Sequence, residues 1–290
     1  MLAVAVCLAA GAARAAADAG TAPVPAGASP AAPARPAMRI VSLAPNLTEL
    51  LFAAGAGARV VGVDASSDHP PAARALPRVG SSATLDIERI LALRPDLIVA
   101  WPHGAARRHA AQLHRLGIPV LTIDPRTIDG IADAIEVLGR RAGTTAQADP
   151  AAQALRERAR VLAARFAASA PVRVFVQIWD VPLMTISDRH LMADGLRVCA
   201  ARGILGDDRA LTPAPSREAV IAADPALLVM VAEDAQAAAW LRQWQRAPAP
   251  RFAAAPRHLA IDPDRFARAS PRFLDAVEVL CRWIDAAPRR

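Results

Sequence analysis

The chain of 290 residues contains no Lys and no Tyr, so all 34 of its basic side chains are Arg. Its net charge of +7 is spread along the sequence without a run of five or six basic residues. Aromatic residues make up 4% of the chain and are not interleaved with the basic ones. Nucleic-acid-binding proteins usually combine basic clusters with aromatic side chains that stack on bases. We therefore expect no nucleic-acid partner.

Long hydrophobic runs are missing as well. Residues 1–15 are apolar and end in the small-residue motif Ala13-Arg14-Ala15, which is typical of a signal-peptide cleavage site. This run is shorter than the roughly 20 residues that a membrane span needs. Residues 16–37 are rich in Ala, Pro and Gly and have no periodicity. The sequence predicts an exported, soluble protein with a signal peptide over residues 1–15 and a disordered leader over residues 16–37.

Cysteine is scarce, with three residues in the chain. Cys7 falls inside the predicted signal peptide, which leaves Cys199 and Cys281 in the mature protein. Neither has another Cys or a His at the spacing of a metal site. An even number of cysteines in an oxidising compartment favours a disulfide. We predict a bond between Cys199 and Cys281 and no metal site.

The common catalytic motifs are absent. The sequence has no nucleophile elbow, phosphate loop, dinucleotide fingerprint or zinc-protease helix. His109 and His114 are five residues apart, so they do not share one helical face. His103, just after a predicted strand, is the His best placed for a ligand role. We expect no enzymatic activity, no catalytic residue and no catalytic cofactor.

What the sequence does contain is a regular alternation of apolar strands and amphipathic helices. Alternation at such short intervals predicts a parallel sheet with helices on both faces. The predicted strands cover residues 39–43, 60–64, 97–101 and 120–124, and the predicted helices cover 46–54, 87–93, 104–116 and 127–141.

A long helix and an internal repeat follow. Asp149 and Pro150 form a helix-start signal, and about twenty residues without a breaker come after it, enough for roughly 30 Å of helix. Residues 218–229 then repeat residues 88–99 at an offset of 130 (218 minus 88). We predict two α/β lobes, residues 38–143 and 171–290, bridged by a helix within residues 144–170. A ligand cleft is expected at the carboxyl ends of the two sheets.

The first strand-to-helix turn carries Pro45, Asn46 and Glu49. Asn46 has the residue type of an N-cap, and Glu49, three residues on, completes a pattern like a capping box. The sequence therefore predicts that these polar side chains mainly start a helix. Because the turn follows a strand, Pro45 and Asn46 are also expected to border the cleft.

Two further groups of charged residues stand at positions that the fold makes informative. Asp264, Arg265 and Arg268 directly follow the last predicted strand, where they can either hold amides, phosphates and carboxylates of a ligand or form a surface ion pair. Glu88 and Glu218 open equivalent helices of the two repeats. They either stabilise the helix dipole or make a two-point acidic contact with a two-fold partner that carries Arg or Lys.

These segments carry a family resemblance. The motifs "RIVSLAPNLTELLFAAG", "VVGV…SSDHPPAA", "IERILALRPDLIVAW" and "RFARASPR" resemble the periplasmic cobalamin-binding proteins of vitamin importers. More broadly, the chain is similar to the helical-backbone class of binding proteins for metal chelates, from about Arg39 to Ile284. The resemblance implies two Rossmann-like lobes with parallel sheets, bridged by one long α-helix.

The resemblance also implies roles for individual residues. Glu88 and Glu218 match the glutamates that dock on arginines of the importer's transmembrane permease dimer, which works with ATPase subunits. Cys199 and Cys281 match the family's disulfide. Ligand contacts are implied for the set Asp264, Phe266 and Arg268. A monomer that binds cobalamin as its transported ligand is therefore expected.

Other ligand positions depart from the family pattern. Aromatic positions of the cobalamin cleft fall here on Ser66, Ser82, Met184 and Thr212, and a further one falls on Arg265. We expect Trp101, Trp179 and His69 to compensate, with His69 offering an imidazole to a cobalt or iron centre.

The function expected from these observations is capture of cobalamin or a related corrinoid and its delivery to an ABC importer. One alternative is a ferric-siderophore or haem-binding protein of the same fold, although a chain without Tyr lacks the Tyr ligand that haem proteins of this class commonly use. From another class, the alternative is an exported metal-dependent hydrolase that works through His69 and His103.

Overall fold

The computed structural model describes residues 35–246, 250–254 and 257–287. The predicted signal peptide, and the predicted leader up to residue 34, lie outside these described residues. Within them, no helix combines the length and the apolar character that crossing a membrane requires.

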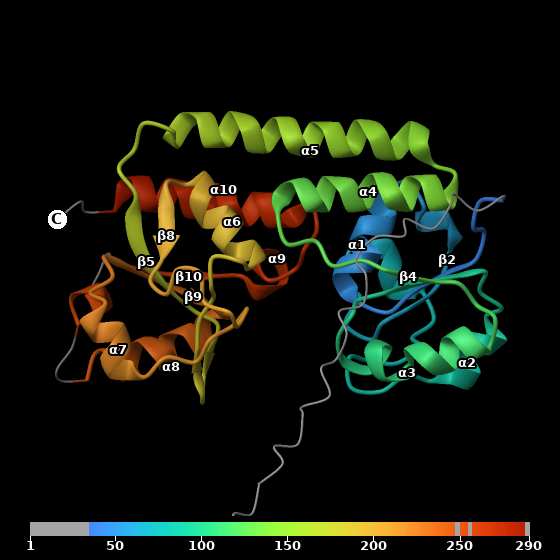
Figure 1. Ribbon diagram of the computed structural model, residues 1–290, viewed down its shortest axis with the longest axis horizontal. Helices are drawn as coiled ribbons and strands as arrows, with labels where there is room; N and C mark the ends of the chain where they lie inside the picture. The colour runs from blue at the N-terminus through green and yellow to red at the C-terminus, as the bar shows by residue number, and fades with distance from the viewer. Residues whose placement is uncertain (1–34, 247–249, 255–256, 288–290) are drawn as a thin grey trace, which may run out of the picture. The chain divides into compact units, whose positions relative to one another are not determined.

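The first half of the chain forms a four-stranded parallel sheet in the order β2-β1-β3-β4 (Figure 1). Short apolar runs form its strands, as the sequence predicts. The strands are β1 (Ile40–Ser42), β2 (Val60–Val63), β3 (Leu97–Ala100) and β4 (Val120–Thr122). The helices are α1 (Pro45–Ala53), α2 (Ile87–Ala92), α3 (Gly104–Arg115) and α4 (Ile128–Ala142), with 3-10 turns η1 (Gly57–Arg59) and η2 (Pro71–Ala75).

The second half forms another four-stranded parallel sheet, in the order β10-β9-β5-β8. Its strands are β5 (Val172–Gln177), β8 (Ala201–Gly203), β9 (Leu227–Val231) and β10 (His258–Ile261), and β6 (Trp179–Asp180) pairs with β7 (Leu183–Met184) in a small hairpin. The helices are α6 (Leu191–Val198), α7 (Arg217–Ala222), α8 (Asp234–Trp244), α9 (Pro263–Phe266) and α10 (Arg272–Ala286), with the turn η3 (Arg251–Ala253).

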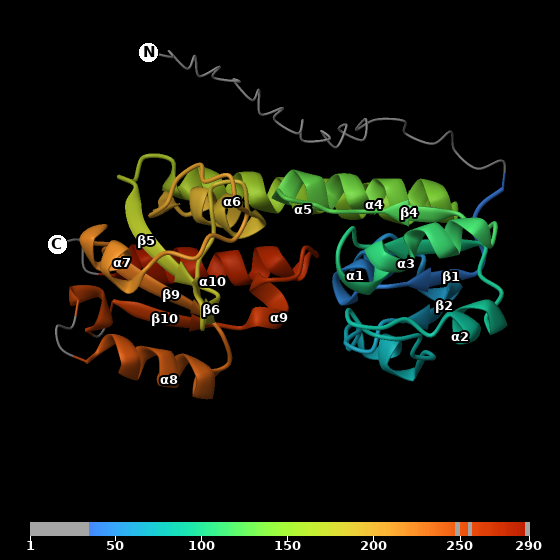
Figure 2. The same ribbon diagram turned by 60° about the horizontal axis from the view of Figure 1, so that its bottom comes forward.

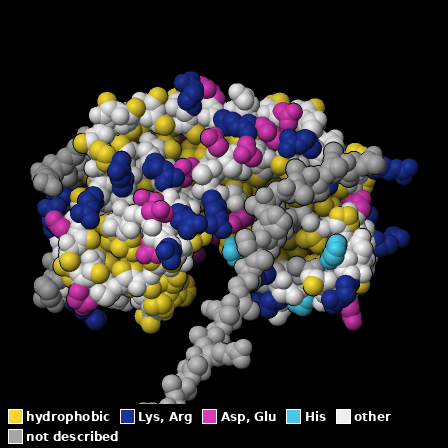
Figure 3. Space-filling view, in the orientation of Figure 1, with side chains coloured by type: hydrophobic (Ala, Val, Ile, Leu, Met, Phe, Trp, Pro, Cys, Tyr) yellow, Lys and Arg dark blue, Asp and Glu magenta, His cyan; other side chains and the backbone are white. Residues whose placement is uncertain are grey.

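Helix α5 (Thr145–Phe166) connects the two sheets along the chain. Its 22 residues correspond to about 33 Å. It packs against α4 and α1 of the first half and against α6 and α10 of the second (Figures 1 and 2). Acidic and basic side chains are interspersed over α4 and α5 (Figure 3), and Arg158 of α5 reaches Asp275 and Glu278 of α10 at 2.8 and 3.0 Å. The predicted fold class is confirmed, whereas the lobe boundaries stay predictions.

Both sheets are covered on both faces. Neighbouring strand residues point to opposite faces, and they enter different hydrophobic clusters. Ile40 of β1 and Val174 of β5 join the large cluster around α1, α4, α5 and α10. Val41 joins a cluster with residues of α2 and α3, and Phe175 joins one with residues of α8. Burial on both faces explains why strands such as β3 and β9 are continuously apolar.

The internal repeat is confirmed as a structural one. Helices α2 and α7 each have six residues and each precede a strand of a parallel sheet. Their N-caps, Asp86 and Ser216, differ by 130 positions (216 minus 86) and both accept a backbone hydrogen bond. After each helix the chain passes through a left-handed residue, Arg94 with φ 45° and Asp224 with φ 42°, again 130 apart (224 minus 94).

The predicted start of the long helix at Asp149 and Pro150 is wrong. Helix α5 begins at Thr145, and Pro150 lies inside it. The preceding helix ends at Gly143 in a left-handed conformation (φ 64°), so α4 and α5 are joined by a tight turn. A Cβ atom added at Gly139 would overlap the Cβ of Ala148, which shows how closely the two helices approach. Packing of this hairpin outweighs the local proline signal.

The predicted capping role of Asn46 and Glu49 is also wrong. The N-cap of α1 is Ala44, without a side-chain cap, and Pro45 takes the first helical position, where its missing N–H costs nothing. Asn46 is therefore the second residue of the helix. Glu49 forms contacts with residues of the second half of the chain, which are described below.

The predicted disulfide is confirmed. Cys199, the C-cap of α6, is bonded to Cys281 of α10, and both residues are buried. The bond joins positions 82 residues apart.

Candidate functional site

A cleft of about 310 Å³ is lined by residues from both halves of the chain. Its first wall consists of residues that follow strands β1 to β4, where the carboxyl ends of the parallel strands meet. The second half contributes the start of α6, Leu211 and residues 267–269. A cleft therefore lies where the sequence predicts the ligand to bind, at the carboxyl ends of the strands.

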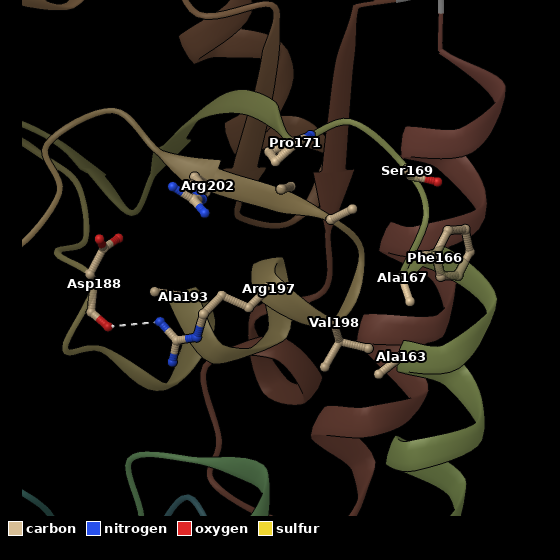
Figure 4. A pocket seen from close by; sticks show the side chains of 12 residues that line it. Ala163, Phe166, Ala167, Ser169, Pro171, Asp188, Ala193, Arg197, Val198 and Arg202 are labelled. Atoms are coloured by element: carbon tan, nitrogen blue, oxygen red, sulfur yellow. Dashed lines mark hydrogen bonds between the residues drawn. The ribbon is translucent and has the colours of Figure 1, made fainter.

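A larger cavity, of about 400 Å³, lies elsewhere (Figure 4). Phe166 of α5, Arg197 of α6 and Arg202 of β8 are among its lining residues. It also includes Pro171, just before β5, so it lies near the amino ends of these strands. Ligands of open α/β sheets bind at the carboxyl ends, so the smaller cleft is the better candidate despite its volume.

Six of the twelve predicted ligand residues line the cleft. They are Pro45, Asn46, Ser66, Ser82, Trp101 and Arg268. Pro45 and Asn46 are the first two residues of α1, directly after the turn that follows β1. Ser66, Ser82 and Trp101 come from loops that follow strands, and Arg268 comes from the segment after α9. Thr212, at one of the family's aromatic positions, does not line the cleft, whereas the adjacent Leu211 does.

The other predicted residues lie outside the lining. His69 is half-buried in the loop after β2. Trp179 and Met184 face each other as a pair in the β6–β7 hairpin, and the Trp179 side chain is exposed, with its indole N–H donating to the carbonyl of Val181. Asp264 contacts Arg268 but does not itself line the cavity.

Arg265 and Phe266 require a correction. The Phe266 ring is fully buried and stacks on Phe273 at 5.3 Å between centroids, so it belongs to the core. Arg265 is exposed and its guanidinium lies 3.4 Å from Asp262. Residues 263–266 of the short helix α9 do not line the cleft, whereas Ala267, Arg268 and Ala269 directly after it do, which a motif match alone does not reveal.

An ordered aromatic wall stands at the end of β3. The indole N–H of Trp101 donates to Asp124 at 3.0 Å. The Trp101 and His103 rings pack edge to face, with their centroids 4.5 Å apart. Arg126 holds the other oxygen of Asp124 at 2.8 and 3.0 Å. Burial tends to raise the pKa of Asp124, but the hydrogen bonds from Trp101 and Arg126 outweigh it and lower this pKa. The carboxylate thus stays charged and holds the indole, which is 40% exposed, as a flat apolar surface.

His190 faces this wall from the second half of the chain. It is the N-cap of α6, and its Nδ1 accepts the backbone N–H of Met192 at 3.1 Å. Burial, reinforced by the nearby positive charge of Arg126, lowers the pKa of His190 to about 4. The imidazole is therefore neutral at physiological pH.

An ionic network centred on Arg268, which we call the floor, reaches the cleft through this residue, since Arg268 is the member of the network that lines the cleft. Its guanidinium donates to Asp68 at 2.6 Å, to Asp264 at 2.6 Å and to Glu49 at 3.2 Å, and only 12% of its side chain is exposed. Burial alone would lower the pKa of Arg268, but the hydrogen bond and charge of Asp68, together with the charge of Asp264, raise it. Arg268 is thus a permanent cation surrounded by carboxylates.

Glu49 anchors this network from the first half of the chain. Its side chain is 2% exposed and accepts hydrogen bonds from Ser270 at 2.7 Å and from Arg272 at 3.1 Å as well as from Arg268. A buried carboxylate needs such partners to stay charged. Residues of α1 and of the α9–α10 segment are therefore held together by charge-assisted bonds.

Sequence reasoning missed several residues of the site. Asp124, Arg126 and His190 line the cleft and Asp68 contacts its lining residue Arg268, yet none of the four was a predicted ligand residue. Asp124 and Arg126 could have been found, since they directly follow β4. His103 lines the cleft, in line with its position after a strand.

Glu88 and Glu218 occupy equivalent places away from the cleft. Each is the second residue of its six-residue helix, and each is exposed. Helices α2 and α7 both lie on the side away from α5 in Figure 1. Hydrogen bonds from its own backbone N–H and from Ser216 lower the pKa of Glu218, which keeps it charged.

The hydrolase alternative gains no support from the geometry. Among the described residues, no group of three or more His, Cys, Asp or Glu side chains is arranged to hold a metal ion. His103 lines the cleft and His69 does not, so the two are not brought together there.

Comparison with known proteins places the chain among binding proteins. Residues 40–251 match the family described as periplasmic binding protein. The vitamin B12-binding proteins of Yersinia pestis (strain Pestoides F) and Yersinia pseudotuberculosis serotype O:1b are each 38% identical over 260 residues, which cover 88% of this chain and 89% of each relative.

Solved structures agree with this. The periplasmic vitamin B12 binding protein of Vibrio cholerae superposes with a TM-score of 0.79 at 35% identity, covering 88% of this chain and 99% of that one. A periplasmic haem-binding protein from Pseudomonas aeruginosa superposes with a TM-score of 0.74 at 27% identity, covering 87% and 94%.

Proposed function

Because the chain belongs to the periplasmic binding protein family, we propose that it captures cobalamin or a related corrinoid and delivers it to an ABC importer. The ligand would lie in the cleft between the carboxyl end of the first sheet and residues 190–191, 211 and 267–269. The vitamin B12-binding relatives at 38% identity over most of both chains support this ligand class.

The observation that carries the proposal is the pairing of a flat wall with a polar floor. Trp101 offers an exposed indole face that Asp124 holds in place, which suits the apolar surface of a macrocycle. Across the cleft, the carboxylates around Arg268 offer acceptors to polar groups at the macrocycle's edge. Such a site binds its ligand without performing chemistry on it.

A periplasmic location is part of the proposal. The family description and the names of the relatives support it. The buried disulfide between Cys199 and Cys281 is also typical of an oxidising compartment. The apolar run at residues 1–15 would be the export signal.

The proposed partner is a transmembrane permease dimer with its ATPase subunits, to which the protein binds as a monomer. Glu88 and Glu218 are the proposed docking residues. Their support is that both are exposed, both are second in short helices, and these helices are repeats of each other. Two equivalent acidic points suit a two-fold symmetric partner that presents basic side chains.

The alternative within the same fold is a haem or ferric-siderophore binder. The similarity to a haem-binding protein keeps it in view, at a lower identity than that of the vitamin B12-binding relatives. Separate binding measurements with each ligand distinguish these alternatives directly.

The test is a calorimetric titration of the mature protein with cyanocobalamin, haemin and a ferric siderophore. We expect saturable one-to-one binding of cyanocobalamin, and binding of only haemin or the siderophore would refute the proposal. Trp101→Ala is expected to weaken cyanocobalamin binding by about tenfold through the lost stacking area. Trp179→Ala, which removes an exposed Trp outside the cleft, is the matched control and should change the affinity by less than about twofold.

A further inference from the structure

We propose that the cleft discriminates between ligands by the charge of their periphery, accepting neutral amides and rejecting carboxylates. Asp68 and Asp264 are the residues that we infer to set this specificity. The inference rests on the proposed function, because it concerns which members of the chelate class the same cleft accepts.

The first support is the charge balance at the floor. Arg268 and Arg272 contribute two positive charges, and Glu49, Asp68 and Asp264 contribute three negative charges, so the network carries a net charge of −1. An arginine at a strand's carboxyl end would ordinarily attract a ligand's carboxylate. Here the positive charge of Arg268 is already paired with the protein's own carboxylates.

The second support is that the other cation of the cleft is neutralised as well. Arg126 holds the carboxylate of Asp124 with two hydrogen bonds. Arg126 and Arg268 are the only Arg side chains among the described residues that line the cleft, and no Lys occurs in the chain. His190 is kept neutral by burial, which lowers its pKa to about 4. A ligand carboxylate would therefore meet no uncompensated Arg charge in the cleft.

The third support is the exposure of the two aspartates. Buried Glu49 already provides a carboxylate partner for both arginines. Asp68 and Asp264 are different, because 47% and 49% of their side chains are exposed, and each contacts Arg268, which lines the cleft. Each carboxylate oxygen has two lone-pair sites, so both residues can accept further hydrogen bonds while they hold Arg268. An amide N–H donates to such an acceptor, whereas a second carboxylate is repelled by it.

This arrangement separates the candidate ligands by their chemistry. The edge of cobalamin's macrocycle bears neutral acetamide and propionamide side chains, which can donate to Asp68 and Asp264. Haem bears two carboxylates, and many ferric siderophores are anionic. The floor of the cleft thus favours the corrinoid over the two alternatives.

The test compares cyanocobalamin with its separated monocarboxylic acids, in which one peripheral amide is hydrolysed to a carboxylate. These ligands have nearly the same size and shape and differ by one negative charge at neutral pH. For the wild-type protein we expect at least one of these acids to bind about tenfold more weakly than cyanocobalamin. The difference should shrink at high salt, because the repulsion is electrostatic.

Two variants assign the effect to the named residues. Asp68→Asn and Asp264→Asn each keep an acceptor oxygen near Arg268 and remove one negative charge. Each should reduce the discrimination between amide and acid to about threefold or less. Glu157→Gln, which removes an exposed carboxylate from α5, is the control and should leave the discrimination unchanged.

The outcomes separate this inference from the proposed function. Wild-type protein that binds cyanocobalamin and all of its acids equally well, or binds the acids more tightly, overturns the inference and leaves the proposed function standing. Unchanged discrimination in both aspartate variants likewise overturns the assignment to Asp68 and Asp264. Failure to bind cyanocobalamin at all overturns the proposed function and this inference together.

Discussion

Replacing Glu49 by Ala removes the carboxylate that joins α1 to the α9–α10 segment. Three charge-assisted hydrogen bonds are lost, from Arg268, Ser270 and Arg272. Breaking a buried ion pair from one side typically costs 3–5 kcal/mol. Because Arg268 keeps Asp68 and Asp264 as partners, we expect the low end, about 3 kcal/mol of unfolding free energy. That corresponds to a melting temperature lower by roughly 6–12 °C for a protein of this size.

The assay is thermal and urea unfolding followed by circular dichroism, with the disulfide intact. Glu49→Gln keeps an acceptor oxygen and should lose about half as much stability. Glu157→Ala serves as the control, because Glu157 pairs with Arg160 on an exposed face of α5, and no measurable change is expected. A melting temperature of Glu49→Ala equal to that of the control would show that the network at the floor does not hold the two segments together.

The remaining predictions concern pH, the disulfide and docking. Burial lowers the pKa of His190 from 6.5 to about 4, so between these two pH values the unfolded state binds a proton that the folded state does not. The free energy of unfolding should therefore fall as the pH drops from 6.5 to about 4, by about 3 kcal/mol in total. His190→Asn should flatten this part of the urea-midpoint profile, and an unchanged slope would contradict the assignment. Reducing the bond between Cys199 and Cys281 should lower the free energy of unfolding by about 4.5 kcal/mol, the chain-entropy estimate for a closed loop of this length. Urea unfolding with and without reductant measures this difference, and an unchanged urea midpoint would refute the estimate. Reversing Glu88 and Glu218 to Arg together should abolish uptake through the cognate importer and leave the cyanocobalamin affinity intact, and uptake that survives would disprove the docking role.

Much of the fold follows from local sequence patterns. The segment around Leu97–Ala100 is a short apolar run between a Pro-containing stop and a polar turn, and it forms β3 as expected. The repeat is visible because residues 88–99 and 218–229 need the same helix-to-strand turn, including the left-handed residues Arg94 and Asp224. By contrast, the start of α5 depends on how it packs against α4, and Pro150 gives a misleading local signal there.

The site was predictable only where position along the chain decides it. Trp101 follows a strand, so the rule for parallel sheets places it at the cleft. The role of Glu49 could not be read locally, because its partner Arg268 is 219 residues away, and its spacing from Asn46 suggested a helix cap instead. Phe266 lies within a motif that matches the family, yet the direction of its side chain depends on packing against Phe273.

The central claim is that the cleft at the carboxyl end of the first sheet binds a corrinoid. Calorimetric titration of the mature protein with cyanocobalamin tests it most directly. The account predicts saturable binding with a stoichiometry of one, together with a higher melting temperature at saturating ligand. The absence of both binding heat and a shift in melting temperature would contradict it.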